Sequence, residues 1–183
     1  QINFTPGTHQ RGMQSTLENQ AGFTMATWQH RPESYGYVRA RSQDPFKHPE
    51  IQPNYLAADT DQQVILAAIK TCRKLAQTEA LRPFIVNETF PGAACQNDDE
   101  LLNSAREIGQ SIYHLMGTCR MGNRDDKTAV VDAELRVHGI KNLRVIDASI
   151  MPTMVSANLN AAVMMIAEKG ADMVLGKLPA KLH

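Results

Sequence analysis

Three short segments in the second half of the sequence carry side chains suited to catalysis. The first runs from Tyr113 to Gly122, and in it His114 enters a stretch that also contains Gly117. Gly117 and Gly122 favour a chain reversal. Catalytic side chains tend to lie on loops that a rigid scaffold holds in place. A single loop histidine is more often an ordinary solvated residue, so His114 by itself is only a candidate.

The second segment, residues 143–152, has a strand-like pattern that ends in Asp147 and small residues such as Ala148. A carboxylate at the end of a strand can bind ribose or ribityl hydroxyls, and small side chains let backbone N–H groups approach a phosphate. The alternative for Asp147 is a structural role in closing a turn. The segment therefore predicts either a nucleotide contact or a turn.

The third segment, residues 155–162, places Asn158 and Asn160 at the start of the last predicted helix. The free N–H groups and the positive dipole end of a helix N-terminus favour an anionic or electron-rich partner. Both asparagines could equally be helix caps, a role that is compatible with function because a cap leaves neighbouring N–H groups free.

Extended segments are predicted mainly in the first half of the chain. Residues 23–28 and 35–41 lie on either side of residues 31–34, whose proline and short polar side chains suit a turn, so these two runs predict antiparallel sheet. The first 22 residues have little periodicity and suit loop or edge structure. Residues 143–147 have strand character near the end of the chain.

Helices are predicted at three places. The pattern of residues 60–63 resembles a capping box and predicts the start of a helix that continues to about residue 75. A short helix is expected after Asn97, where acidic residues favour the N-terminus. The pattern of residues 160–175 predicts the strongest helix, with Gly176 as its C-terminal stop.

Composition narrows the possible functions. The chain has 183 residues, is 43% hydrophobic, and carries 19 basic and 19 acidic residues. A neutral chain does not favour nucleic acid or an anionic membrane as a partner, and no apolar run reaches the roughly 20 residues needed to cross a bilayer. Three widely spaced cysteines predict free thiols and no metal site. We expect a cytoplasmic protein, or one at the periphery of a membrane.

Several motifs occur in one order along the second half. They are His114-x-x-Gly117-Thr118-Cys119-x-Met121-Gly122, Val131-Asp132, Leu135-Arg136-Val137-His138-Gly139, the whole of residues 143–152, and Asn158-Leu159-Asn160. Together they resemble the C-terminal region of the glucose-methanol-choline (GMC) oxidoreductases. Residues 162–169 and 31–34 are most similar to the choline dehydrogenase-like branch.

The resemblance implies an enzyme that oxidises a primary alcohol to an aldehyde, with hydride transfer to FAD. His114 matches the family's catalytic histidine and would accept the hydroxyl proton. Imidazole suits this role because its ordinary pKa of about 6.5 is close to working pH. Asn158 matches the position that pairs with that histidine at the substrate hydroxyl. Leu115 stands where choline-oxidising relatives often have proline, so the resemblance does not assign choline itself.

The resemblance also assigns cofactor contacts. Asp147 and Ala148 would contact the ribityl–pyrophosphate part of FAD, and the backbone at Asn160 and Ala161 would lie at the flavin pyrimidine edge. The sequence contains no G-x-G-x-x-G, the motif that holds the ADP part of such cofactors. We therefore expect FAD to bind only in a longer protein with an N-terminal FAD-binding part, and this chain to be inactive alone.

The family layout predicts an α+β fold, with an antiparallel sheet that carries helices on one face and a C-terminal strand and helix that complete an FAD domain. Residues 1–113 would form the substrate-binding part, and residues 114–183 the catalytic loop and the segment that returns to the FAD domain. Three alternatives stay open, namely an oxidase of the same family, a lyase of the same family, and a non-catalytic binding or structural domain.

Overall fold

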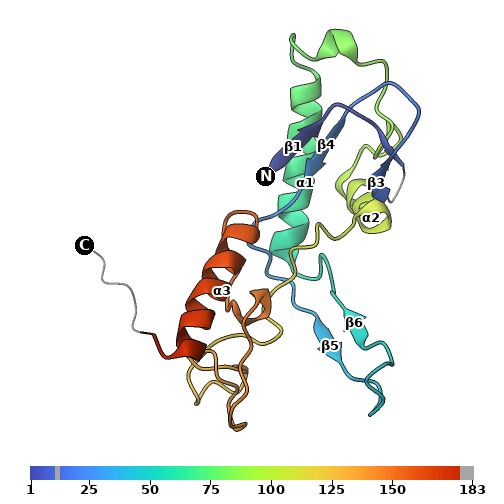
Figure 1. The fold of residues 1–183 in the computed structure, drawn as a ribbon. Helices are drawn as coiled ribbons and strands as arrows, with labels where there is room; N and C mark the ends of the chain where they lie inside the picture. Colours follow the sequence, from blue (N-terminus) through green and yellow to red (C-terminus); the bar gives the residue numbers. More distant parts are fainter. Residues whose placement is uncertain (11–12, 178–183) are drawn as a thin grey trace. The chain divides into compact units, whose positions relative to one another are not determined.

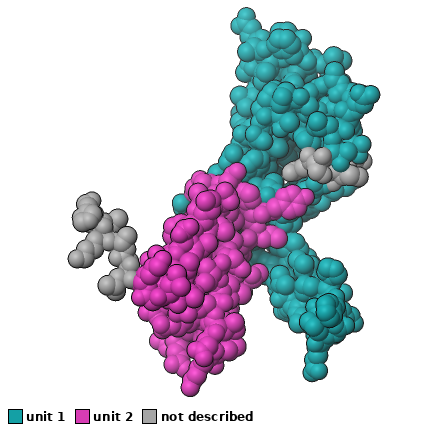
Figure 2. Space-filling model, in the orientation of Figure 1, with its two compact units in different colours: residues 1–112 teal, residues 113–183 magenta. Residues whose placement is uncertain are grey.

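The computed structural model describes residues 1–10 and 13–177. The chain folds into two compact units, Gln1–Ile112 and Tyr113–His183, which are coloured separately in Figure 2. Strands and helices are both present, and the predicted α+β class is confirmed. Among the described residues, no helix is long and apolar enough to span a bilayer.

The described residues of the first unit form three small antiparallel sheets of two strands each. The pairs are β1 (Ile2–Thr5) with β4 (Thr24–Thr27), β2 (His9–Gln10) with β3 (Met13–Leu17), and β5 (Tyr37–Arg39) with β6 (Glu50–Gln52). The extended runs predicted at residues 23–28 and 35–41 therefore contain strands, β4 and β5. These two strands do not pair with each other. The expectation of a single antiparallel sheet is therefore wrong, because the described strands form three separate pairs.

A buried carboxylate explains why β4 and β5 do not form a hairpin. The chain between them is held on helix α1 (Asp59–Ala76) by Asp61, whose side chain is only 4% exposed. Asp61 accepts hydrogen bonds from the N–H groups of Glu33 and Ser34 at 2.9 and 2.8 Å and from the Ser34 hydroxyl at 2.5 Å. These bonds direct the backbone towards the helix instead of into a turn.

The same contacts change how α1 begins. The capping-box start at residues 60–63 is wrong, because the N-cap is Ala58 and no side chain of the helix caps it. Ser34 acts from outside instead, since its Oγ accepts hydrogen bonds at 3.0 Å from the N–H groups of Ala57 and Ala58. Because the Asp61 carboxylate accepts hydrogen bonds from residues 33–34, Asp61 links that segment to the first turn of α1.

Helix α2 (Asp98–Ile108) begins as predicted. Asn97 accepts a hydrogen bond from the N–H of Glu100, and the Glu100 carboxylate accepts one from the N–H of Asn97, which completes a capping box. Leu101 is 1% exposed and packs on the core side of the helix. Helices α1 and α2 pack against each other, and β4 runs beside α1 (Figure 1). A short 3-10 helix, η1 (Arg82–Phe84), lies between the two helices in sequence.

The second unit is a long irregular chain wrapped around helix α3 (Asn160–Leu175), with a 3-10 turn η2 (Ala148–Ile150) before it. The buried core consists of Val131, Leu135, Ile150, Met151, Leu159 and Ile166. Helix α3 has the predicted bounds, and Gly176 ends it in the left-handed conformation with φ of 66°.

The segment predicted as a C-terminal strand is extended but does not form a regular strand. Its ladder is reduced to one isolated antiparallel bridge between Arg136 and Arg144, with hydrogen bonds from Val137 N–H to Leu143 O and from Val145 N–H to Leu135 O. A regular strand needs a neighbouring strand that pairs with it along its length. Among the described residues, the 143–147 segment pairs only with the short segment around Arg136.

Candidate active site

The loop after His114 is fixed by backbone hydrogen bonds to the segment that contains Ala148. Cys119 N–H donates to Ser149 O at 2.9 Å, and Met121 N–H donates to Ile150 O at 2.7 Å. Gly117 lies in the left-handed region with φ of 85°, where glycine carries no steric penalty. The first and second predicted segments are therefore neighbours in the structure.

His114 is half-buried at the beginning of this loop. Its ring makes no hydrogen bond within the described part of the chain, so both ring nitrogens remain available to a ligand. Tyr113, directly before it, is a non-glycine residue with φ of 61°. Sequence reasoning did not predict this left-handed residue, because tyrosine has no preference for that conformation.

Asp147 closes a turn, which is the structural alternative that the sequence offered for it. Its Oδ1 accepts hydrogen bonds from the Ser149 N–H at 2.8 Å and the Ser149 hydroxyl at 2.5 Å, which caps η2. Its Oδ2 has no hydrogen bond within the described residues, and the residue is exposed. Ala148 packs against the core of the unit. One carboxylate oxygen thus holds the turn while the other faces solvent.

The two asparagines do not cap α3, so this alternative is wrong. The N-cap residue is Leu159, and its side chain makes no capping hydrogen bond. The Asn160 amide nitrogen instead lies 3.8 Å from the sulfur of Met164. Asn158 is exposed and makes no hydrogen bond within the described residues. The N-cap side chain therefore satisfies none of the N–H groups in the first turn of α3, which includes Ala161.

One hydrophobic core joins the three segments. Met116 in the His114 loop, Ile150 in η2 and Leu159 between the asparagines belong to the same cluster, and η2 packs against α3. The structure thus brings the segments of all six predicted site residues around one core. It shows no hydrogen bond between His114 and Asn158.

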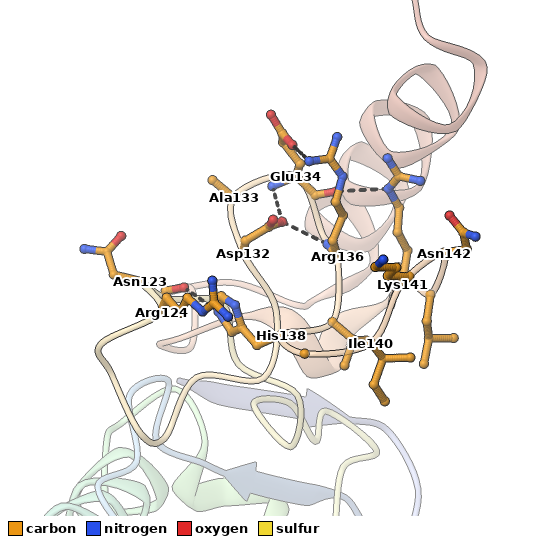
Figure 3. Close-up of a pocket in the computed structure, with 15 residues that line it drawn as sticks. Asn123, Arg124, Asp132, Ala133, Glu134, Arg136, His138, Ile140, Lys141 and Asn142 are labelled. Carbon is orange, nitrogen blue, oxygen red and sulfur yellow. Dashed lines mark hydrogen bonds and ion pairs between the residues drawn. The ribbon is translucent and has the colours of Figure 1, made fainter.

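A separate concave surface lies elsewhere in the second unit, and sequence reasoning missed it (Figure 3). It is formed by residues 122–124 and 132–144 and has a volume of about 1090 Å³. None of the six predicted site residues lines it. The available signal was the density of cationic side chains in residues 136–144. We call this surface the basic cup.

Cys72, Cys95 and Cys119 are free cysteines, and burial raises the pKa of the Cys72 thiol. Among the residues that the structure describes, no group of three His, Cys, Asp or Glu side chains could hold a metal ion.

Comparisons with known proteins agree with the motifs. The sequence model of the GMC oxidoreductase family matches residues 32–167, a range that contains all six predicted site residues. Mitochondrial choline dehydrogenase of Homo sapiens is 48% identical over 147 residues, which are 80% of this chain and 25% of that protein. Oxygen-dependent choline dehydrogenase of Escherichia coli O127:H6 is 42% identical over 178 residues, or 97% of this chain and 31% of that protein.

Solved structures give the same result. Pyridoxine 4-oxidase from Mesorbium loti superposes with a TM-score of 0.70 at 32% identity, covering 85% of this chain and 29% of that one. A fungal aryl-alcohol oxidase also superposes with a TM-score of 0.70. It is 31% identical, and the match covers 80% of this chain and 24% of that one. The chain thus spans 24–31% of the length of these four proteins. From motifs, family match and structural similarity together, the chain belongs to the GMC oxidoreductase family.

Proposed function

We propose that the chain is the C-terminal, base-bearing part of a flavin-dependent dehydrogenase that oxidises a primary alcohol to an aldehyde. The observation that carries this proposal is the common core that joins the His114 loop, the Asp147 turn and the start of α3. The two curated relatives described above are named as choline dehydrogenases, which supports an alcohol as the substrate class. In this proposal residues 1–113 belong to the substrate-binding part, and residues 114–183 supply the catalytic loop.

The second unit has groups that fit part of an FAD molecule. The first turn of α3, at Asn160 and Ala161, has N–H groups that the N-cap side chain does not satisfy, and such groups suit the carbonyl oxygens of a flavin pyrimidine edge. Asp147 has one carboxylate oxygen left for a ribityl hydroxyl, and Ala148 is small enough to let the cofactor approach. FAD, when bound in the longer protein, would accept the hydride equivalent from the alcohol carbon.

His114 and Asn158 would act on the alcohol hydroxyl. The substrate O–H bond breaks as its proton passes to a free ring nitrogen of His114, while the electron pair stays with the oxygen that becomes the aldehyde carbonyl. The Asn158 amide would donate a hydrogen bond to that oxygen and hold it in position. Both side chains are free of other hydrogen bonds within the described residues, so neither role requires a native contact to break.

Replacing the base tests the proposal. In the full-length protein, His114→Ala should lower kcat/KM by roughly 100-fold or more, because general-base catalysis contributes on that scale. Flavin absorbance per protein should stay unchanged. The control is His48→Ala, since His48 is an exposed histidine of the first unit, away from the His114 loop in sequence. Near-normal turnover of His114→Ala with flavin bound would remove His114 from the mechanism.

An oxidase is the second candidate, because both structural relatives described above are named as oxidases. The two candidates differ only in the electron acceptor. Turnover of a panel of alcohols by the full-length protein, measured under air and then with an artificial acceptor under nitrogen, separates them. Hydrogen peroxide formed in step with aldehyde would identify the oxidase.

A further inference from the structure

The basic cup has two carboxylates, and both are engaged inside it. The Oδ1 of Asp132 accepts hydrogen bonds from the N–H groups of Glu134 and Arg136 at 2.8 and 2.9 Å. The Glu134 carboxylate forms an ion pair with Arg136. Figure 3 shows these contacts at one end of the cup. The Glu134 charge is therefore paired with a cation of the cup, whereas the Asp132 carboxylate is held by backbone N–H groups.

Three further cations have unused hydrogen-bonding capacity. Arg124 and Lys141 make no hydrogen bond or ion pair within the described residues. Arg144 uses only its Nε, which donates to Glu134 O at 3.1 Å, so its two terminal nitrogens stay available. In Figure 3, Arg124 and Lys141 lie on opposite sides of the cup with His138 between them. The cup thus presents spaced positive charges with no acidic partner of their own.

Apolar side chains accompany these charges on a fixed turn. Ile140 is 56% exposed and Leu143 is 46% exposed, although both are large hydrophobic residues. The turn is closed by hydrogen bonds from Val137 N–H to Leu143 O at 3.0 Å and from Ile140 N–H to Val137 O at 3.3 Å. Gly139 takes the left-handed conformation there, with φ of 80°. The backbone geometry therefore holds apolar and cationic groups beside one another before any partner binds.

We propose that the basic cup docks an acidic segment of another polypeptide. Carboxylates of the segment would pair with Arg124, Lys141 and Arg144, and an aliphatic side chain between them would cover Ile140 and Leu143. The cup is open and about 1090 Å³ in volume, which suits several residues of an extended chain better than one small anion. Charge complementarity selects the sign of the partner, and the apolar contact adds a hydrophobic component.

Two other anionic partners fit less well. Nucleic acid bases bind by stacking on aromatic rings, and among the described residues that line the cup none is Phe, Tyr or Trp. A lipid bilayer presents a broad, nearly flat surface, whereas the cationic groups here line a hollow. An acidic polypeptide can enter a hollow and supplies both carboxylates and aliphatic side chains.

The test uses the full-length protein and a fluorescein-labelled peptide of alternating Glu and Leu residues, with binding followed by fluorescence anisotropy. Lys141→Glu and Arg124→Glu should each weaken binding roughly tenfold, because each places a like charge opposite a carboxylate. High salt should also weaken binding, whereas Ile140→Ser should do so at every salt concentration. The matched control is Lys169→Glu, since Lys169 is exposed on α3 outside the cup and the charge change is the same.

Three results would overturn the proposal. The first is no saturable binding of the peptide by the unmodified protein. The second is an equal loss of affinity in Lys169→Glu, which would show attraction by net charge alone. The third is tighter binding of an oligonucleotide or an anionic vesicle of matched charge than of the peptide. Thermal unfolding of each variant confirms that it is folded, and the substitutions at Lys141 and Arg124 provide two independent tests of the cup.

Discussion

The Asn158 side chain should contribute less to the rate than the imidazole of His114. In the full-length protein, Asn158→Ala removes a hydrogen bond to the substrate oxygen but leaves the base, so we expect a loss of about 1–3 kcal/mol in transition-state stabilisation. This corresponds to roughly a tenfold to hundredfold decrease in kcat/KM. The control is Asn123→Ala, an exposed asparagine in the basic cup.

The double variant of His114 and Asn158 examines whether they act on one hydroxyl. Groups that work as a unit give less than additive losses, so the effect of the double variant on the activation free energy should be smaller than the sum of the single effects. Strict additivity would mean that Asn158 acts somewhere other than the hydroxyl that His114 deprotonates. Steady-state kinetics of the four proteins provide the complete cycle.

At the scale of single elements, the Asp61 contact makes stability depend on pH. Burial alone would raise the pKa of Asp61, but hydrogen bonds from Ser34 and from the backbone of the 33–34 segment outweigh it and lower the pKa below its ordinary value of 3.8. A lowered folded pKa stabilises the fold above the unfolded pKa, and this stabilisation is lost as pH falls through the folded value.

The prediction is a smaller acid sensitivity in Asp61→Asn. Denaturant titrations of the isolated chain at neutral pH and near pH 3 should show a larger decrease in the free energy of unfolding for the unmodified chain than for the variant, because asparagine cannot be protonated in this range. Thr71→Ala, an exposed substitution on the same helix, should leave the acid sensitivity unchanged. Identical acid sensitivity of Asp61→Asn and the unmodified chain would show that Asp61 titrates normally.

Helix α3 depends on a close contact at Gly170. A Cβ placed on Gly170 would lie 2.4 Å from Cγ2 of Ile146, which is too close for two non-bonded carbon atoms. Gly170→Ala gains about 1 kcal/mol of helix propensity, but overpacking a core costs about 1–3 kcal/mol. We expect a net decrease in the free energy of unfolding, measured by denaturant titration.

A matched comparison separates the two effects. Gly170→Ala combined with Ile146→Val keeps the clashing methyl group, whereas Gly170→Ala combined with Ile146→Ala removes it. Only the second combination should recover the stability lost to the clash, judged against Ile146→Ala alone. A more stable Gly170→Ala single variant would show that α3 moves away from residue 146 at little cost.

At the scale of the whole molecule, the proposed function gives this chain only part of the groups that would hold FAD, namely the start of α3 and Asp147. The sequence has no G-x-G-x-x-G motif to hold the ADP part. The isolated chain should therefore be colourless after desalting. A stoichiometric flavin spectrum that survives desalting would show that these groups alone are sufficient.

The sequence determined by itself the features that depend on neighbours along the chain. The capping box at Asn97, the C-terminal end of α3 at Gly176 and the glycine turn after His114 follow from hydrogen bonds and backbone preferences that span only a few residues. Ordered motifs also identified the family.

Only the tertiary structure decided the features that depend on distant partners. Asp61 binds residues 33–34, 27 and 28 positions away, and this contact moved the start of α1 and separated β4 from β5. The same reason applies to residues 143–147, whose strand pattern gave one bridge because the described chain offers no continuous partner. The basic cup likewise needs residues 122–124 beside the turn at residues 137–143, where His138 Nε2 lies 3.1 Å from the carbonyl oxygen of Gly122, 16 positions away.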